Sequence, residues 1–391
     1  MAFSRRNQVV TRPALERQAQ YIGDPIEKLH FLRREMERGA QDVYRPWWRR
    51  LLLGALVIFS LSAILPAPVV VSDVMRPGQD FEAFPGRVQR QAAGGLGKVW
   101  IVEESHEYEV YSNGLRVDNN YAIENQRRFY QVLNRVHSMQ PAQEWRSQPV
   151  GIVFHTTESN LAPFEADQNG MLKRLGRSVL NNIREKRSYN FVIDRFGRVF
   201  RVVDEADMAN HAGNSVWADN EYAYVNLNNS FLAVAFEAQT EPGDGGQSIN
   251  TAQVHAGRVL TQMLRSKYGI AAENCVTHAQ VSVNPFNMRI GYHTDWARNF
   301  PFSELGLSNN YELPLGSLSD FGFEYDDTFL KAIGPRVWKG LELGMRRLEH
   351  AAAASGRSVA DHRSLIRERY RRLYSAYKQT GALEESSNVT N

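Results

Sequence analysis

The sequence predicts an α/β protein with a mixed central sheet flanked by helices, preceded by one N-terminal transmembrane helix and followed by a helical C-terminal extension. Three observations predict this fold class. An uncharged apolar run lies near the N-terminus, strand-like apolar runs alternate with a helical pattern in the middle third, and apolar residues recur at helical spacing near the C-terminus. We therefore expect five parts: an arginine-rich cytoplasmic tail (1–46), a transmembrane anchor (47–71), a linker with an N-terminal extension (72–147), a central domain (148–305) and the helical C-terminal extension (306–391).

Residues 51–71, LLLGALVIFSLSAILPAPVVV, carry no charge and are long enough to cross the ~30 Å hydrocarbon core of a bilayer as a helix. Trp47 and Trp48 suit the membrane interface, and the arginines around them mark the cytoplasmic side. The segment before this run is too long for the n-region of an ordinary signal peptide. We therefore expect an uncleaved anchor that places residues 72–391 outside the cytoplasmic membrane.

The next block combines a linker with regular structure. A composition rich in Gly, Pro, Arg and Gln predicts a linker in residues 72–98. Residues 99–118 alternate well enough for two strands across a turn at Asn113-Gly114. Residues 121–139 are expected to contain a helix. The block is either a small accessory unit or an extension packed on the central domain, and we prefer the extension.

The central domain shows three strand-like patterns. Residues 151–159 form an apolar run, and residues 188–203 predict a hairpin of two alternating strands around a turn that contains Gly197. Residues 228–239 predict a further strand that ends on Glu237. These runs are the expected strands of the central sheet.

Helical patterns follow the strands. Asn250 or Thr251 caps a predicted helix that Gly269 stops. The chain is again helical in character from about Asp326, and its last helix is expected near residues 359–378, with apolar side chains on one face and arginines opposite. We expect this last helix to pack on the domain, and a lipid-surface or partner-binding helix is the alternative.

Composition limits the classes of function. The formal net charge of +3 is too small to indicate a nucleic-acid partner. The single cysteine, Cys275, cannot form a disulfide within the chain, and we expect a small buried side chain there.

Three side chains of metal-binding types lie at the ends of apolar runs in the central domain. His155 closes the first run, His278 lies in CVTHAQVS after the predicted helix, and Asp295 lies in GYHTDWARNFPF. Side chains at such positions can converge on one site. Two imidazoles and one carboxylate form a three-ligand zinc set whose fourth position is open to water or substrate, as in catalytic zinc sites.

The central domain also carries short motifs in a fixed order: FHTTE, SYNF, NHAG, NSFLAVAFE, THAQV and HTD. In this order they resemble the zinc-dependent N-acetylmuramoyl-L-alanine amidases of the type-2 amidase and peptidoglycan-recognition-protein family, over roughly residues 148–305. The resemblance implies an amidase-type mixed sheet, Zn²⁺ on His155, His278 and Asp295, and hydrolysis of the amide between N-acetylmuramic acid and L-alanine in peptidoglycan or muropeptides. With the predicted anchor, it implies a single-pass protein of a bacterial inner membrane whose catalytic domain lies in the periplasm.

The resemblance assigns further site residues. Tyr189 matches the position of a tyrosine near the zinc-bound water in some members. His293 falls where a lysine is typical, so it would stabilise the oxyanion or protonate the leaving amine. The usual catalytic glutamate position is Ala235, which leaves Glu237 as the expected general base. One alternative makes His293 the third ligand and Asp295 the carboxylate that orients it.

Two other functions fit the same residues. Ala235 and the long segment between His278 and Asp295 also fit a catalytically inactive peptidoglycan-binding or scaffold protein on the same fold. A zinc amidase that acts on a different acylated peptide or amino sugar is the third possibility, because a fold does not determine its substrate. His211 in NHAG is expected to shape the substrate groove or to satisfy a turn rather than to bind metal.

Overall fold

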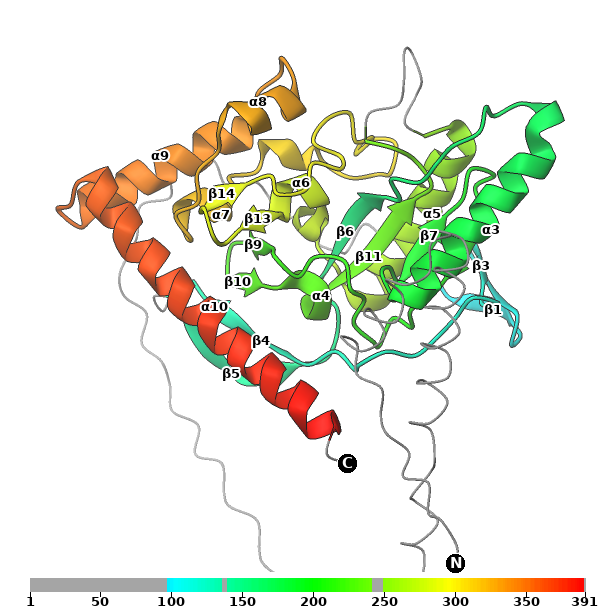
Figure 1. Cartoon of the computed structure of the whole chain (residues 1–391), viewed down its shortest axis with the longest axis horizontal. Coiled ribbons are helices and arrows are strands. Elements are labelled where there is room, and N and C mark those ends of the chain that lie inside the picture. The colour runs from blue at the N-terminus through cyan, green and yellow to red at the C-terminus, as the bar shows by residue number, and fades with distance from the viewer. Residues whose placement is uncertain (1–96, 136–138, 241–248, 390–391) are drawn as a thin grey trace, which may run out of the picture. The chain divides into compact units, whose positions relative to one another are not determined.

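Parallel strands that are buried on both faces form the centre of the structure. The structure is a computed structural model and describes residues 97–135, 139–240 and 249–389 (Figure 1). Strand β6 (Gly151–Thr156) pairs in parallel with β11 (Phe231–Phe236) on one side and with β12 (Cys275–Thr277) on the other. Every residue of these three strands is buried, and near-continuous apolar runs are typical of parallel strands covered on both faces.

The central sheet has eight strands in the order β1-β2-β3-β8-β7-β11-β6-β12. The remaining members are β1 (Ile101–Glu104), β2 (Tyr108–Tyr111), β3 (Arg116–Asp118), β7 (Phe191–Ile193) and β8 (Val199–Arg201). The predicted hairpin of residues 188–203 is confirmed, because β7 and β8 pair antiparallel across a turn in which Gly197 has φ +75°. Strand β3 pairs in parallel with β8, so the N-terminal block continues the central sheet.

The N-terminal block contains three strands in this sheet where the sequence predicted two. The predicted turn at Asn113-Gly114 joins β2 to β3. A second turn divides the first run, because the Ser105 hydroxyl accepts hydrogen bonds from the backbone N–H groups of Glu107 and Tyr108. Such a side-chain to backbone contact offers the chain an alternative to continuing the strand.

The prediction of a helix in residues 121–139 is wrong. This region instead forms β4 (Tyr130–Asn134), which pairs with β5 (Gln140–Arg146) and with β10 (Tyr222–Val225). The second sheet has the order β5-β4-β10-β9, with β9 at Val216–Ala218. Tyr130 and Val132 are buried in the core that this sheet helps to form, and packing of aromatic and β-branched side chains on a sheet outweighs a local helical pattern.

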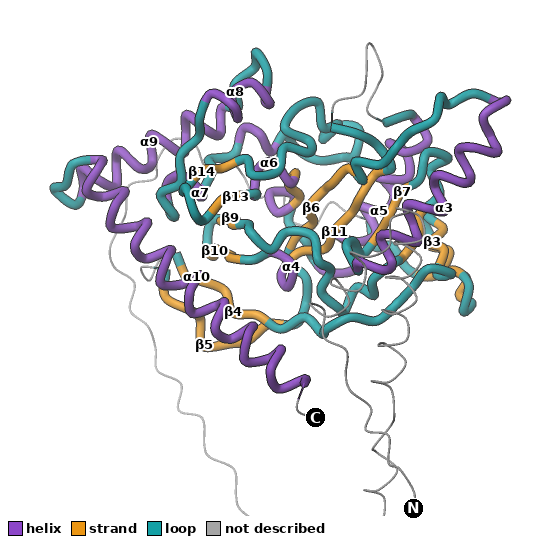
Figure 2. The backbone as a smooth tube through the Cα atoms, in the orientation of Figure 1, coloured by secondary structure: helices purple, strands orange, loops and turns teal. Residues whose placement is uncertain are grey.

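Two long helices cover the two faces of the central sheet (Figures 1 and 2). Helix α3 (Asn169–Lys186) buries Leu180 and Ile183 against the face that carries Val192. Helix α5 (Thr251–Tyr268) buries side chains against the opposite face. The predicted limits of α5 are confirmed, because Asn250 forms a capping box with Gln253 and the C-cap Gly269 has φ +66°. Helix α3 was not predicted.

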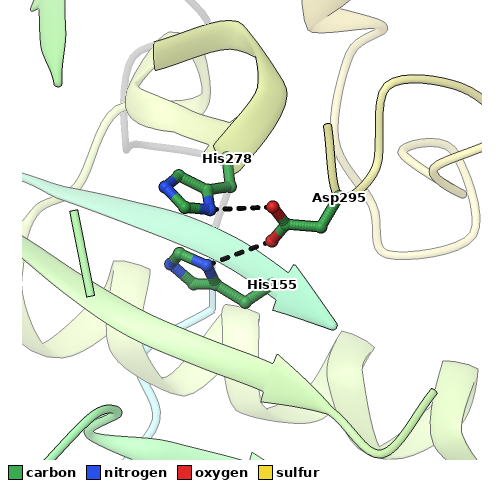
Figure 3. A group of neighbouring side chains, drawn as sticks. All are labelled: His155, His278 and Asp295. Atoms are coloured by element: carbon green, nitrogen blue, oxygen red, sulfur yellow. Dashed lines mark hydrogen bonds and ion pairs between the residues drawn. The ribbon is translucent and has the colours of Figure 1, made fainter. Parts of the chain in front are cut away.

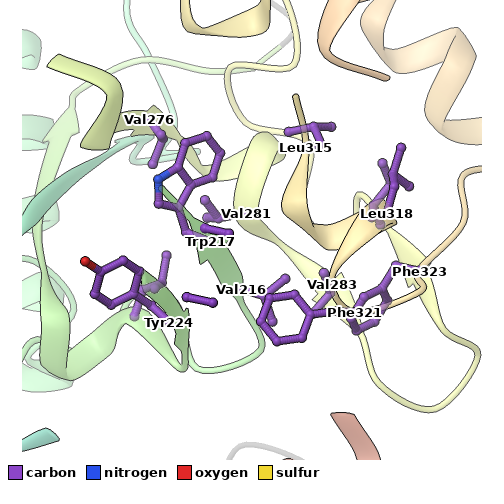
Figure 4. Packing of buried hydrophobic residues seen from close by; sticks show 14 of the residues in the cluster. Val216, Trp217, Tyr224, Val276, Val281, Val283, Leu315, Leu318, Phe321 and Phe323 are labelled. Carbon is purple, nitrogen blue, oxygen red and sulfur yellow. The ribbon is translucent and has the colours of Figure 1, made fainter. Parts of the chain in front are cut away.

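The remaining elements are short near the sheet and longer toward the C-terminus. The short elements are η3 (Ala166–Gln168), α4 (Leu227–Ser230), η4 (Ala272–Asn274), α6 (His278–Val281), β13 (Val283–Asn284), β14 (Arg289–Ile290), η5 (Asn310–Glu312) and α7 (Gly316–Ser319). The predicted helical character beyond Asp326 is confirmed by α8 (Asp327–Ile333), α9 (Lys339–Ala354) and α10 (Val359–Val389). Figure 4 shows how Leu318 of α7 and Phe323, just after it, share one core with Trp217 of β9 and Val276 of β12.

All described residues belong to one compact unit, Pro85–Asn391. None of the helices in this described part is long and apolar enough to cross a membrane. The predicted anchor at residues 47–71, the tail before it and the linker as far as residue 96 lie outside the described residues.

Candidate metal centre

The three predicted ligands meet at the carboxyl edge of the central sheet. His155 lies near the end of β6, and His278 is the first residue of α6, directly after β12. Because β6 and β12 are adjacent parallel strands, both histidines lie at the same edge of the sheet. Asp295 comes from the loop after β14 (Figure 3). All three side chains are buried, and one ligand atom from each lies within 4.8 Å of the others.

The Asp295 carboxylate joins the two imidazoles. Its Oδ1 lies 2.8 Å from Nδ1 of His278, and its Oδ2 lies 3.2 Å from Nδ1 of His155 (Figure 3). The two imidazole rings lie 4.4 Å apart between centroids. Two nitrogen ligands and one anionic oxygen ligand that converge from three segments form the donor set that zinc accepts in catalytic sites. The residues therefore fit a zinc ion.

The electrostatics of the group favour the protonation states that a metal requires. Burial, and after it the nearby His278, lower the pKa of His155 to about 4 against the opposing effect of Asp295. Burial alone would raise the pKa of the Asp295 carboxyl, but His278 and His155 outweigh that effect and hold this pKa well below its usual range. A neutral His155 and an ionised Asp295 are ready to act as ligands.

His293 lies beside this group but outside it. Its ring stacks on the His278 ring with 4.7 Å between centroids and an interplanar angle of 19°. The side chain of His293 is exposed on one side, but its partial burial and the neighbouring His278 lower its pKa. Among the described residues, the group that could hold a metal contains Asp295 as its third member.

Tyr189 and Glu237 have different surroundings. The Tyr189 ring lies 5.1 Å from the His155 ring, its hydroxyl donates to the backbone oxygen of Thr156 at 3.5 Å, and burial raises its pKa. The Glu237 carboxylate instead faces Gly176 of α3 and accepts a hydrogen bond from the backbone N–H of Arg195 at 3.2 Å. Burial raises the pKa of Glu237. Tyr189 is therefore placed at the site, whereas the carboxylate of Glu237 is directed toward α3.

His211 lies closer to the ligands than the sequence indicated. Its Nδ1 lies 3.0 Å from Nε2 of His155, and the two rings meet edge to face. Within the described structure, its own Nε2 is buried without a hydrogen-bond partner. The motif NHAG places a polar cluster between strands but gives no signal for contact with a residue 56 positions away.

A cavity of about 310 Å³ opens beside the ligands. Its walls carry imidazole, amide and phenol groups, contributed by Asn210, His211, Asn214, Asn228, His278, Tyr292 and His293. Asn228 supports one wall, because its side-chain oxygen accepts hydrogen bonds from the backbone N–H groups of His211 and Ala212. The cavity thus gives a substrate access to the edge of the candidate metal group.

The buried Arg128 supports the backbone of Asn228, one of the residues that line this cavity. Its guanidinium donates to the backbone oxygens of Glu205, Asn228, Asn229 and Phe231 and to the side-chain oxygen of Asn190. Burial lowers the pKa of Arg128 to about 10, so the group stays charged near neutral pH. The sequence predicted no role for this residue, because nothing in a local pattern shows that an arginine is buried.

Several solved structures are similar to parts of the chain. AmpDh3 from Pseudomonas aeruginosa, solved in complex with anhydromuramic pentapeptide, shares 19% identity over 43% of this chain and 62% of its own, with a TM-score of 0.31. AmiD from E. coli, solved with anhydro-N-acetylmuramic acid-L-Ala-D-gamma-Glu-L-Lys, shares 21% identity over 43% of this chain and 59% of its own, with a TM-score of 0.31. The chain therefore spans about three fifths of the length of these two proteins. Drosophila peptidoglycan recognition protein SD shares 15% identity over 35% of this chain and 73% of its own, with a TM-score of 0.25.

No curated protein matches the chain. A family model described as N-acetylmuramoyl-L-alanine amidase matches residues 145–295, a segment that begins just before β6 and ends on the third candidate ligand. The segment contains the parallel strands, both histidines of the candidate metal group and the carboxylate that joins them. Residues 145–295 of this chain therefore belong to the type-2 family of N-acetylmuramoyl-L-alanine amidases.

Proposed function

We propose that the chain is a zinc-dependent hydrolase that cleaves the amide between N-acetylmuramic acid and L-alanine in peptidoglycan or muropeptides. One observation carries the proposal: a segment of the amidase family brings His155, His278 and Asp295 together as a buried group beside an open cavity. When bound by these three residues, zinc supplies a Lewis acid that polarises the scissile carbonyl and makes water more acidic.

The residues around the ligands have roles that follow from their contacts. Nδ1 of His211 lies 3.0 Å from Nε2 of His155; if His211 accepts there, the proton of His155 is held on Nε2 and its Nδ1, next to Asp295, would hold the metal. His293 stacks on His278 at the cavity wall, where its N–H can donate to the developing oxyanion, or where its ring can take a proton from the attacking water and pass it to the leaving amine. The Tyr189 hydroxyl, protonated at neutral pH, donates to Thr156 in the free protein and can turn this one donor to the oxyanion when substrate binds beside His155.

A second candidate function is peptidoglycan binding without turnover. Ala235 is the register partner of His155 on the neighbouring strand, at the position where the family carries its catalytic glutamate. The carboxylate of Glu237, which we expected to replace it, faces α3 and accepts from Arg195. If neither position supplies a general base, the cavity beside the candidate metal centre would bind a muropeptide and leave it intact.

The test is muropeptide hydrolysis by the full chain in detergent, with zinc content measured on the same sample. We expect release of free stem peptide, loss of activity on chelation and recovery with added zinc. His155→Ala should lose both zinc and activity, whereas His255→Ala, which changes an exposed histidine of α5, should keep both. Binding without cleavage in a fully zinc-loaded sample would establish the non-catalytic candidate. Cleavage that survives chelation would show that zinc is not required.

We also propose that residues 47–71 anchor the protein in the inner membrane with its catalytic domain in the periplasm. The apolar run and its flanking arginines support this orientation, and peptidoglycan lies on the periplasmic side. Protease added to spheroplasts should digest residues 97–391 and leave residues 1–46 protected. Protection of both parts would contradict the proposed orientation.

A further inference from the structure

The C-terminal helix α10, drawn in red in Figure 1, contacts a residue that lines the cavity beside the candidate metal centre. The hydroxyl of Tyr374 on this helix donates a hydrogen bond to Oδ1 of Asn214 at 3.0 Å. Asn214 lines the cavity together with His278 and His293. The amidase-family segment ends at residue 295, so a residue outside that segment contacts the wall of its cavity.

Packing holds the tyrosine in place. Tyr370, one helical turn earlier, is 1% exposed and lies edge to face with Phe323 at 4.8 Å and with Phe321 at 5.8 Å between centroids. The Tyr370 ring in turn stacks on the Tyr374 ring at 5.7 Å. The hydroxyl of Tyr374 is therefore presented by a buried aromatic cluster rather than by a free surface side chain.

The backbone of Asn214 is held as well. Its carbonyl oxygen accepts a hydrogen bond from the backbone N–H of Val283 in β13 at 3.0 Å. The amide group thus has a fixed backbone on one side and a fixed partner for Oδ1 on the other. An asparagine whose Oδ1 accepts from a hydroxyl must turn its Nδ2 donor elsewhere. Among the described residues, this Nδ2 has no hydrogen-bond acceptor, and Asn214 is one of the residues that line the cavity.

We propose that Asn214 is a specificity-determining residue whose Nδ2 donates a hydrogen bond to an amide carbonyl oxygen of the muropeptide, and that Tyr374 is the positioning residue that orients it. This inference rests on the proposed amidase function and adds the C-terminal extension to the substrate site. Because the contact is made to bound substrate and not to the reacting group, it contributes to binding of the ground state and the transition state alike.

The test is a double-mutant cycle on the full chain with purified muropeptide as the probe. Tyr374→Phe removes the hydroxyl, and Asn214→Ala removes the donor. Each variant should raise KM, and the Kd measured by calorimetry, by about 3- to 10-fold, with kcat changed by less than about twofold. Because Tyr374 acts through Asn214, the double variant should bind no more weakly than Asn214→Ala alone. A purely structural role would instead give additive losses.

Tyr130→Phe is the matched control. Its hydroxyl also donates to one protein oxygen, that of Gln148 at 2.6 Å, but it lies on β4 and does not line the cavity. This variant should leave KM unchanged. The inference is overturned if Tyr374→Phe behaves like Tyr130→Phe, or if the losses in the double variant add. If the wild type binds muropeptide without cleaving it, the proposed reaction falls while the Kd values still test Asn214. A wild type that neither binds nor cleaves contradicts both.

Discussion

The central feature at the scale of single residues is one carboxylate shared between two imidazoles. The Asp295 carboxylate lies within hydrogen-bond distance of Nδ1 of both His155 and His278, so the ligand atoms already lie together within the protein. Convergence before binding means that little conformational entropy is lost when an ion binds. The orientation of His155 depends in turn on His211, which occupies its second ring nitrogen.

The contact between His211 and His155 yields a prediction about metal affinity. His211→Ala removes the acceptor for Nε2 of His155, so this imidazole can rotate and change its tautomer. Loss of such a partner typically lowers metal affinity by about 10- to 100-fold. We expect that range in a zinc competition assay against a chromogenic chelator, with the far-UV circular dichroism of the protein preserved.

Two further variants sharpen this measurement. His211→Gln retains a side chain that can accept from Nε2, so it should recover part of the affinity. His106→Ala, at an exposed site on the turn between β1 and β2, should bind zinc like the wild type. Equal zinc affinity in His211→Ala and the wild type would contradict the role given to His211.

The candidate ligands could be predicted from the sequence, whereas their supporting residues could not. His155 lies near the end of one buried strand and His278 directly follows another, so local patterns place both at strand ends, where parallel pairing brings them to one edge. The supports act across large separations: Arg128 reaches residues about 100 positions away, and Tyr374 reaches Asn214. A single sequence carries no signal for such contacts between side chains.

At the scale of elements, the sequence predicts the limits of an element correctly where capping or turn residues mark its ends. Helix α5 is bounded by a capping asparagine and a C-terminal glycine, and the β7–β8 hairpin turns at Gly197. Strand β4 carries no such signal, and its register partners lie in β5 and β10. Its strand form depends in part on pairing with β10, a segment nearly 90 residues away, which a helical pattern in the sequence cannot reveal.

The start of helix α9 yields a prediction at this scale. Gly340 is buried where α9 packs closely against the backbone that follows η5. A Cβ added at this position would lie 2.1 Å from the carbonyl oxygen of Leu313. Gly340→Ala must therefore separate these two segments, and overpacking of this kind typically costs about 1–3 kcal/mol. Chemical denaturation at neutral pH should show the loss in the free energy of unfolding.

Gly170 provides the matched control for this substitution. It is also the second residue of a helix, α3, but an added Cβ there would meet nothing within 4 Å. Gly170→Ala should stabilise the protein by about 0.4–1 kcal/mol, because alanine restricts the unfolded chain. Equal effects of the two substitutions would show that the contact between α9 and the segment after η5 is looser than the structure indicates.

At the scale of the whole molecule, the N-terminal block and the amidase-family segment share one sheet and one buried ionic cluster. Arg201 of β8 binds both carboxylate oxygens of Glu109 in β2, at 2.8 and 2.7 Å, and also binds Glu205 at 2.7 Å. Glu205 accepts further hydrogen bonds from Lys267 and Tyr268 at the end of α5. The cluster therefore ties the strands before the family segment to both a strand and a helix within it.

This cluster makes stability depend on pH. Burial raises the pKa of Glu205, but Arg201 and Lys267 outweigh burial and hold it below the ordinary value of 4.5. A carboxyl whose pKa is lower in the folded state stabilises the protein at pH values above the unfolded pKa. That contribution is lost as the pH falls through the folded pKa. Protonation of Glu205 should thus weaken the connection between the N-terminal strands and the rest of the sheet.

Glu205→Gln tests this connection. At pH 7 the substitution leaves the buried Arg201 with one carboxylate partner in place of two, and we expect a loss of about 3 kcal/mol in the free energy of unfolding, measured with urea. The difference between the variant and the wild type should begin to shrink below pH 4.5, where the carboxyl of the unfolded chain takes up protons, and it should disappear as the pH falls through the lower folded pKa. Glu342→Gln, which breaks an exposed pair with Arg346 on α9, should change stability by less than about 1 kcal/mol at either pH. A difference between Glu205→Gln and the wild type that stays constant down to pH 3 would mean that the cluster contributes through packing rather than through charge.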